Sequence, residues 1–352
     1  MNPFPYDPNE VLQASEYDAG TKRAYLHFKT PISPKENWMR ALRHEKPAWL
    51  PMRSDTISFT PRCIPDNIAR GFVLDGGPRI TNPGGPDMFG VEWVFDPAIN
   101  GSMVRPGKPL LQDIADWEKV LVFPDVDSWD WAGSAEMSRE YRNTDRLVEA
   151  WHFTGFFERL ISFMDFEGAA VAVIDEDSIP YVHSLFRALT DLYKKIIGKE
   201  KEYFDIDMIY FHDDWGGQRS PFFSLATCRE MLVPYMREIT DFCHANDIVF
   251  DLHSCGKNEM LVPAMIESGM DAWGGQPIND KEMLHKKYGD QIMIAINSPF
   301  RDGGTDEEIE AFCVSFVEKY WPDIQNRPVY LADTFPNALV RRRIYELSRS
   351  AE

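Results

Sequence analysis

The chain has 352 residues and a formal net charge of −19, and 44% of its residues are hydrophobic. That length suits one large α/β barrel or two smaller domains, and that hydrophobic content is ample for a sizeable core. The acidic balance argues against nucleic acid or an anionic membrane as the main partner, and the apolar runs are too short to span a membrane.

The N-terminal segment lacks both the positive region and the apolar region of a signal peptide. Because the five cysteines are odd in number and widely scattered, they do not form a disulfide framework. We therefore predict a cytoplasmic protein with reduced thiols. Residues 1–36 are rich in Pro, Tyr and charge, which indicates an extended arm before the folded domain.

The N-terminal half of the domain has a weak pattern. Residues 37–44 predict a helix and residues 49–53 a first strand. Residues 57–86 hold several Gly and Pro without a clear period, which predicts a long inserted loop over the site. Further elements are expected as a strand at 91–95, a hairpin region at 101–109 and a helix at 114–120.

A regular alternation of strands and helices begins near residue 146. The predicted strands are 147–152, 206–211, 248–252, 271–275, 292–297 and 328–331. The predicted helices are 155–164, 179–197, 224–246, 259–268, 280–288, 306–319 and 337–348. Since no Gly-rich phosphate-binding motif accompanies them, the pattern predicts an α/β fold of the (β/α)8 TIM barrel type, with one domain over residues 37–352.

The motif His253-Ser254-Cys255-Gly256 follows a predicted strand. Residues i and i+2 of a strand point to the same face, so His253 and Cys255 could share one tetrahedral Zn²⁺. Gly256 permits a tight turn directly afterwards. The alternative is a buried structural cysteine beside a hydrogen-bonded histidine.

A second polar cluster, His212-Asp213-Asp214-Trp215, follows the preceding strand. The adjacent carboxylates of Asp213 and Asp214 point in different directions, so one could face the barrel centre and orient a substrate. The alternative is an aspartate that caps a helix or anchors a turn. Trp215 and Gln218, in the same loop, are candidate substrate-binding residues.

Four further candidates lie at other predicted strand ends. Arg53 could hold a carboxylate or phosphate, or form an ion pair. His152 could act as a general acid or base, although a core histidine is the alternative. Asn297 and Asp333 close later strands and could add polar groups to the same rim.

Several motifs resemble the uroporphyrinogen decarboxylase superfamily, and the likeness covers nearly the whole chain from about Asn37. They are Arg40-Ala41-Leu42-Arg43-His44-Glu45-Lys46-Pro47, the run 213–221, Leu252-His253-Ser254-Cys255-Gly256 and Glu267-Ser268-Gly269-Met270-Asp271. The resemblance implies a (β/α)8 barrel. It implies either a decarboxylase or a zinc-dependent methyltransferase that exchanges methyl groups with a corrinoid protein or a thiol.

In the methyltransferases the resemblance implies zinc ligands at His253 and Cys255 and a third, normally Cys, after the last strand, where this chain has Asp333. True decarboxylases carry an Arg-rich loop after the first strand, and here that segment supplies only Arg53. The methyltransferase branch is therefore the closer resemblance.

The expected function is a zinc-dependent methyltransferase. It would move a methyl group between a small methylated substrate, an ether, amine or thiol, and a corrinoid carrier protein. Asp213 and Asp214 would orient the substrate, with His152 and Arg53 in supporting roles. A tetrapyrrole decarboxylase without metal and a non-catalytic ligand-binding barrel are the alternatives, and a homodimer is possible.

Overall fold

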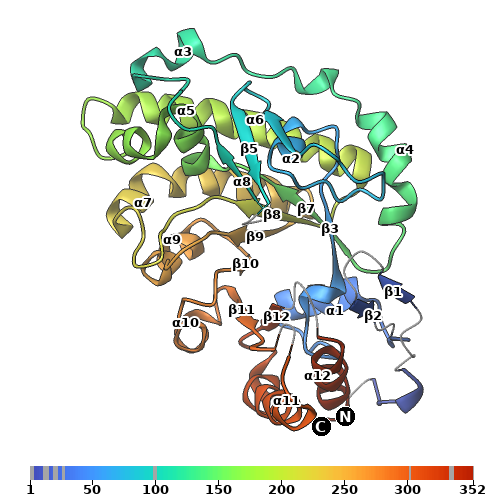
Figure 1. The fold of residues 1–352 in the computed structure, drawn as a ribbon. Helices are drawn as coiled ribbons and strands as arrows, with labels where there is room; N and C mark the ends of the chain where they lie inside the picture. The colour runs from blue at the N-terminus through green and yellow to red at the C-terminus, as the bar shows by residue number, and fades with distance from the viewer. Residues whose placement is uncertain are drawn as a thin grey trace. The chain divides into compact units, whose positions relative to one another are not determined.

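The structure is a computed structural model, and the residues that it describes are 4–10, 16–18, 23–25, 28–97, 101–300, 303–332 and 337–351. Strands alternate with helices along most of the chain (Figure 1). The helices are α1 Pro34–Leu42, α2 Pro65–Ala69, α3 Trp117–Val120, α4 Trp131–Arg142, α5 Phe156–Ala172, α6 Ile179–Phe204, α7 Leu225–Met231, α8 Val233–Ala245, α9 Val262–Glu267, α10 Lys281–Tyr288, α11 Asp306–Tyr320 and α12 Ala338–Ser350.

The main sheet has seven strands among the described residues, in the order β12-β11-β10-β9-β8-β7-β3. Their bounds are β3 Thr56–Phe59, β7 Leu147–His152, β8 Met208–His212, β9 Val249–His253, β10 Ala272–Trp273, β11 Met293–Asn297 and β12 Val329–Ala332. The pairs β7–β8, β8–β9, β10–β11 and β11–β12 are parallel. The predicted α/β class is therefore confirmed, and a closed eight-stranded barrel stays a prediction.

The chain divides into two compact units by its internal contacts. The terminal unit comprises Met1–Ile57, Asp145–Leu147 and Ala272–Glu352, and the central unit comprises Ser58–Thr144 and Val148–Asp271. The central unit contains β7, β8 and β9 together with α2 to α9, whereas the terminal unit contains β10, β11 and β12 with α1, α10, α11 and α12.

Helix α6 organises the core of the central unit. It packs against α4, α5 and α8, as Figure 1 shows for the layer of helices beside β7 and β8. Its apolar side chains recur every three or four residues, so they form one buried stripe. The stripe includes Val182, Leu185, Leu189, Tyr193 and Ile196, all fully buried.

The predicted single helix 224–246 is wrong, because two helices occupy this segment. Leu232, with φ −114° and ψ −45°, separates α7 from α8. Pro234 follows in the first turn of α8, where the missing N–H of proline does no harm. The proline therefore favours a new helix start over continuation of α7.

The predicted first strand at residues 49–53 is also wrong. Met52 makes only a single bridge, to Leu331, and residues Arg53–Asp55 form a 3-10 turn. The Asp55 carboxylate accepts the Met52 N–H at 3.1 Å and the indole N–H of Trp49 at 2.9 Å. These bonds turn the chain, so the strand begins only at Thr56.

The predicted long loop at residues 57–86 instead contains most of β3, all of α2, and β4 Gly84–Pro86. Strand β4 pairs antiparallel with β5 Glu92–Asp96, which pairs in turn with β6 Gly101–Val104. A small three-stranded sheet therefore occupies the segment for which the sequence indicated a loop, a strand and a hairpin region.

A buried ion cluster fastens this small sheet to α5. Arg159 is fully buried and pairs with Asp66 and, at 2.7 Å, with Asp87. Asp87 also accepts the indole N–H of Trp93 at 3.0 Å, and Asp66 accepts the Met88 N–H at 3.0 Å. One guanidinium therefore joins α2, the β4–β5 connection and α5.

Glu200, on α6, is fully buried, and neither of its carboxyl oxygens has a hydrogen-bond partner in the described part of the chain. Burial raises the pKa of this carboxyl from its ordinary 4.5 to about 8. The folded protein then keeps a proton that the unfolded chain releases. The free energy of unfolding consequently falls as the pH rises from about 4.5 to about 8.

Glu200→Gln should raise the free energy of unfolding at pH 8 by about 2–4 kcal/mol, because the neutral amide removes the ionisation that burial opposes. At pH 4 we expect almost no difference, since Glu200 is protonated in both states. Urea denaturation at the two pH values measures this. Glu202→Gln, at a site 58% exposed on the same helix, is the control. Equal effects of Glu200→Gln at pH 4 and pH 8 would contradict the prediction.

In the terminal unit, α11 packs against α12, and residues 4–10 of the predicted arm lie on α12. The buried Arg349 guanidinium binds the Glu10 carboxylate at 2.6 Å and the backbone oxygens of Phe4 and Pro5. Tyr345 donates to the same carboxylate at 2.7 Å. These residues of the arm therefore pack within the unit.

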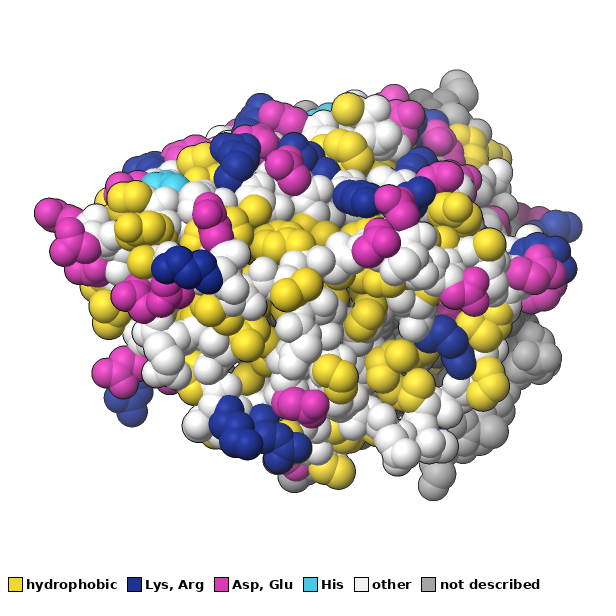
Figure 2. Space-filling model, turned by 90° about the horizontal axis from the view of Figure 1, so that it is seen from above, with side chains coloured by type: hydrophobic (Ala, Val, Ile, Leu, Met, Phe, Trp, Pro, Cys, Tyr) yellow, Lys and Arg dark blue, Asp and Glu magenta, His cyan; other side chains and the backbone are white. Residues whose placement is uncertain are grey.

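Charges of both signs share the surface. In the face drawn in Figure 2, Lys and Arg side chains are interspersed with Asp and Glu, and hydrophobic side chains are exposed between them. The acidic excess is therefore not gathered into one patch on this face. Within the described ranges, no helix combines the length and apolarity that crossing a membrane requires.

Candidate metal centre and adjoining pocket

The loops that follow β8 and β9 are bonded to each other in the central unit. His212 and His253, at the ends of the two parallel strands, are paired in register. The Asp213 N–H donates to the His253 carbonyl at 3.0 Å, and the Trp215 N–H donates to the Ser254 hydroxyl at 2.9 Å. Side chains of both loops therefore meet at one edge of the sheet, where parallel α/β folds place their sites.

Gly256 makes this contact possible. Its φ is 91°, a conformation that L side chains rarely adopt. A Cβ atom added there would lie 2.2 Å from the Gly216 carbonyl oxygen. The Lys257 N–H next donates to the Gly217 carbonyl at 2.9 Å, which continues the pairing. The glycine therefore lets the two loops approach at backbone distance.

Three possible metal ligands converge at this edge. One donor atom from each of Asp214, His253 and Cys255 lies within 4.8 Å of the others, and all three residues are half-buried. The Cys255 sulfur is 3.4 Å from Nε2 of His253, and the Asp214 carboxylate accepts the Cys255 N–H at 2.7 Å. Tyr210 contacts Nδ1 of His253 at 3.1 Å, which leaves Nε2 directed to the cluster.

This donor set fits zinc. Catalytic zinc sites use three protein ligands of the N, S and O types and keep a fourth position open. Burial, followed by the charge of Asp214, raises the pKa of the Cys255 thiol, so the thiol is protonated without a cation. A bound divalent cation reverses that preference, because it stabilises the thiolate. Asp214 is thus a third possible ligand beside His253 and Cys255, a position for which the sequence suggested Asp333.

Asp213 has a different position from Asp214. Its buried carboxylate accepts the N–H groups of Phe157 and Glu158, at 3.2 and 2.8 Å, in the first turn of α5. It also accepts the indole N–H of Trp215 at 2.9 Å. Burial raises the pKa of Asp213 to about 6, while these bonds lower it. The contacts match the helix-capping alternative, because Asp213 satisfies N–H groups that α5 cannot.

Three other candidates of the central unit lie outside the pocket described below. His152 is buried with its ring stacked on Phe211, and burial lowers its pKa to about 3, as expected of a neutral core histidine. Trp215 is fully buried, and Gln218 is exposed on the loop surface. The structure places none of them in the Asp214–His253–Cys255 cluster.

The remaining candidates belong to the terminal unit. Arg53 is buried in the 3-10 turn, where its carbonyl accepts the Thr56 hydroxyl at 2.9 Å. Asn297 ends β11 and contacts the Lys281 ammonium at 3.4 Å. Asp333 lies outside the described residues. Their proposed roles stay predictions.

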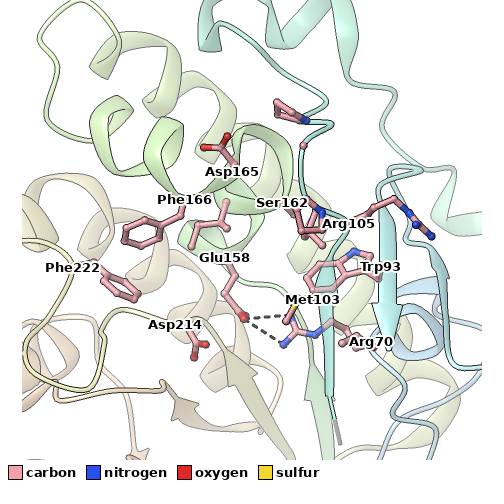
Figure 3. Close-up of a pocket in the computed structure, with 16 residues that line it drawn as sticks. Arg70, Trp93, Met103, Arg105, Glu158, Ser162, Asp165, Phe166, Asp214 and Phe222 are labelled. Atoms are coloured by element: carbon pink, nitrogen blue, oxygen red, sulfur yellow. Dashed lines mark hydrogen bonds and ion pairs between the residues drawn. The ribbon is translucent and has the colours of Figure 1, made fainter. Parts of the chain in front are cut away.

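A pocket of about 440 Å³ adjoins the Asp214–His253–Cys255 cluster within the central unit (Figure 3). Asp214 belongs to both, so the pocket reaches the possible ligands. Its walls come from β5 and β6, from α5, and from the loop after β8. The residues that line the pocket include Arg70, Trp93, Glu158, Phe166, Asp214 and Phe222.

An ion pair lies inside this pocket. Both terminal nitrogens of Arg70 bind Oε1 of Glu158, at 3.2 and 3.3 Å, and the guanidinium lies 4.6 Å from the Trp93 ring centre. Oε2 of Glu158 is buried and has no hydrogen-bond partner among the described residues. Burial, and then the charges of Asp214 and Asp213, raise the pKa of Glu158 to about 8, although Arg70 opposes this.

Sequence reasoning missed Glu158, Arg70 and the aromatic walls. Glu158 could have been found from its place in the first helical turn after β7, since residues after barrel strands tend to be functional. Arg70 and Trp93 carried no comparable signal, because Arg70 lies in the region interpreted as a loop and Trp93 in the short strand expected at residues 91–95.

Comparison with known proteins bears on the fold. No protein-family model and no curated protein matches the chain. It is similar to the structure of a methyltransferase from Methanosarcina mazei, at 16% identity and a TM-score of 0.59, over 90% of this chain and 98% of that one. A sugar phosphate isomerase/epimerase from Parabacteroides distasonis, at 7% identity, covers 69% of this chain and 79% of its own with a TM-score of 0.32, too low to carry an argument. The first likeness shows a shared fold.

Proposed function

We propose that the protein is a zinc-dependent methyltransferase that moves a methyl group between a small methylated substrate and a corrinoid carrier protein. The observation that carries this proposal is the convergence of Asp214, His253 and Cys255 beside a pocket. The fold shared with the Methanosarcina mazei methyltransferase and the sequence resemblance support it. The corrinoid carrier protein is proposed from the sequence resemblance. A homodimer is an expectation from the sequence alone.

In this proposal the residues of the site have different roles. Asp214, His253 and Cys255 hold the metal, which when bound supplies Lewis acidity to the heteroatom that carries the methyl group. Tyr210 fixes the His253 ring through Nδ1 at 3.1 Å, as outer-shell partners of metal ligands do. Asp213 holds the first turn of α5, and thereby positions Glu158 in the pocket. The aromatic walls exclude water from the bound substrate.

Asp214 is the third ligand that we propose for this site. Because it lies in the loop after β8 and accepts the Cys255 N–H, it is held close to the thiol before any metal binds. A carboxylate oxygen is an accepted zinc ligand. A tetrapyrrole decarboxylase has less support, since a polycarboxylate needs several basic groups and Arg70 is already paired with Glu158.

The deciding experiment measures zinc and turnover in the same preparation. Protein purified without chelator should contain about one equivalent of zinc by mass spectrometry, and should form methylcobalamin from cob(I)alamin and a methyl donor. Asp214→Ala should reduce both, because one ligand is lost. Asp191→Ala, at an exposed position 70% accessible on α6, should change neither. Folded protein without zinc or turnover would leave the non-catalytic ligand-binding alternative.

A further inference from the structure

Aromatic side chains form opposite walls of the pocket. Trp93 comes from β5, Phe166 from α5 and Phe222 from the loop after β8. Phe166 and Phe222 meet edge to face, with ring centres 4.8 Å apart and an interplanar angle of 70°. Figure 3 shows this pair on one side of Glu158 and Trp93 on the other. Such walls favour a flat ring, which packs on aromatic faces and edges.

The size of the pocket points the same way. At about 440 Å³ it falls in the range of sites that enclose drug-sized ligands. A methyl donor of one or two carbons would leave most of this space to water. A ring-bearing donor would instead touch Trp93 and the Phe166–Phe222 pair together, and so remove apolar surface from water.

Charge in the pocket disfavours an anionic substrate. The Arg70 guanidinium is paired with Glu158 and lies over the rings of Trp93 and Phe153, at 4.6 and 5.2 Å. Arg105 is exposed, and Figure 3 shows its side chain turned away from Glu158. Two further carboxylates, Asp165 and Asp214, belong to the lining. A substrate carboxylate would therefore meet acidic groups without a basic partner of its own.

Glu158 offers a polar contact at the end of the pocket near Asp214. Its Oε2 is buried and has no partner among the described residues, whereas Oε1 is held by Arg70. Figure 3 shows the Glu158 carboxyl and Asp214 at the same end of the site. A buried carboxylate oxygen without a donor is unfavourable, so a ligand hydroxyl that donates a hydrogen bond to Oε2 is stabilised there.

We propose that the pocket accepts an uncharged, ring-bearing methyl ether. Its ring lies between Trp93 and the Phe166–Phe222 pair, and its methoxy group lies at the end of the pocket that Asp214 shares with His253 and Cys255. This inference rests on the proposed methyl transfer. The bond between the methyl carbon and oxygen breaks and leaves its electron pair on oxygen. The methyl group would join cobalt(I) of the carrier protein's corrinoid, which supplies the electron pair of the new bond. A proton from water turns the leaving oxygen into a hydroxyl, which can then donate to Oε2 of Glu158.

Calorimetric titration with methoxybenzene tests this assignment in metal-free and zinc-loaded protein. We expect saturable binding to both forms, binding of benzoate at least about tenfold weaker, and no saturable binding of methanol. Phe222→Leu should weaken methoxybenzene binding about fivefold to tenfold, through loss of ring packing. Phe223→Leu is the matched control, because Phe223 adjoins Phe222 in the chain and does not line the pocket.

Three outcomes would overturn the assignment: no binding of methoxybenzene, tighter binding of benzoate or of phenyltrimethylammonium, or equal effects of Phe222→Leu and Phe223→Leu. Thermal unfolding of each variant checks that the fold is retained. Cys255→Ser should leave methoxybenzene binding unchanged, since the thiol does not line the pocket. Zinc and methyl transfer without methoxybenzene binding would refute only the substrate class. Methoxybenzene binding without zinc or turnover would refute only the proposed function.

Discussion

Replacing Cys255 with serine is expected to reduce zinc content from about one equivalent to nearly none, and methyl transfer with it. Removing an outer-shell partner of a metal ligand lowers metal affinity by up to about 100-fold. Because Cys255 would bind the metal directly, we expect its loss to lower zinc affinity by more than that. The reason is chemical, because an alcohol binds zinc far more weakly than a thiolate does. Mass spectrometry of metal after gel filtration gives the first quantity, and methylcobalamin formation gives the second.

Cys63→Ser is the matched control for this variant. Cys63 is also half-buried in the central unit, and it is not part of the Asp214–His253–Cys255 cluster. We expect its zinc content and turnover to equal those of the wild type. Full zinc content in Cys255→Ser would refute the assignment of Cys255 as a ligand.

Replacing Arg159 with methionine is expected to lower the free energy of unfolding by about 3–5 kcal/mol. The guanidinium is fully buried between Asp66 and Asp87, which are also buried. Its removal leaves two carboxylates without a cation in a medium of low dielectric constant. Chemical denaturation at neutral pH measures the loss of stability. The small sheet β4-β5-β6 should unfold first, because Asp87 lies between β4 and β5.

Arg187→Met is the control for Arg159→Met. Arg187 forms an ion pair with Glu238 at the surface, with 51% of its side chain exposed. Solvent screens such pairs, so we expect a change below about 1 kcal/mol. Similar losses of unfolding free energy in the two variants would show that the burial of Arg159 does not make its ion pairs more stabilising than a surface pair.

The alternation of strands and helices after residue 146 could be predicted because apolar periodicity governs that part of the chain. Strand β7 has the predicted bounds, Leu147–His152. Interruptions within helices were harder to predict from the sequence. Helix α5 is kinked at Asp165, where φ is 69° and the side chain accepts the Gly168 N–H at 3.0 Å. The Phe163 carbonyl at this kink accepts the Leu111 N–H, a tertiary contact that no local pattern encodes.

The region before residue 146 resisted prediction for a physical reason. Its Gly and Pro residues obscure strand periodicity, and its elements are held by distant side chains such as Arg159. The hairpin β5–β6 agrees with the expected strand and hairpin region. The surrounding elements α2 and β4 depend on burial against α5, so they could not be inferred from propensity alone.

The site could be predicted only where local spacing determines geometry. His253 and Cys255 are two residues apart at a strand end, and their donor atoms lie 3.4 Å apart. The separate positions of Asp213 and Asp214 depend instead on through-space contacts, one with α5 and one with Cys255. Because Asp213 and Asp214 are adjacent, the sequence indicated that their side chains point in different directions. Only the fold shows which of them contacts α5 and which contacts Cys255.

The close contact between Gly256 and Gly216 also bears on how the proposed zinc ion would enter and leave the site. Because backbone hydrogen bonds hold the loops after β8 and β9 together, the donors of Asp214 and Cys255 remain within reach without an ion. Metal uptake then requires little ordering of the chain. Unlike zinc fingers, which are unfolded without metal, this protein should survive chelation with its fold intact. Zinc supply could therefore control activity reversibly, without a cycle of unfolding and refolding.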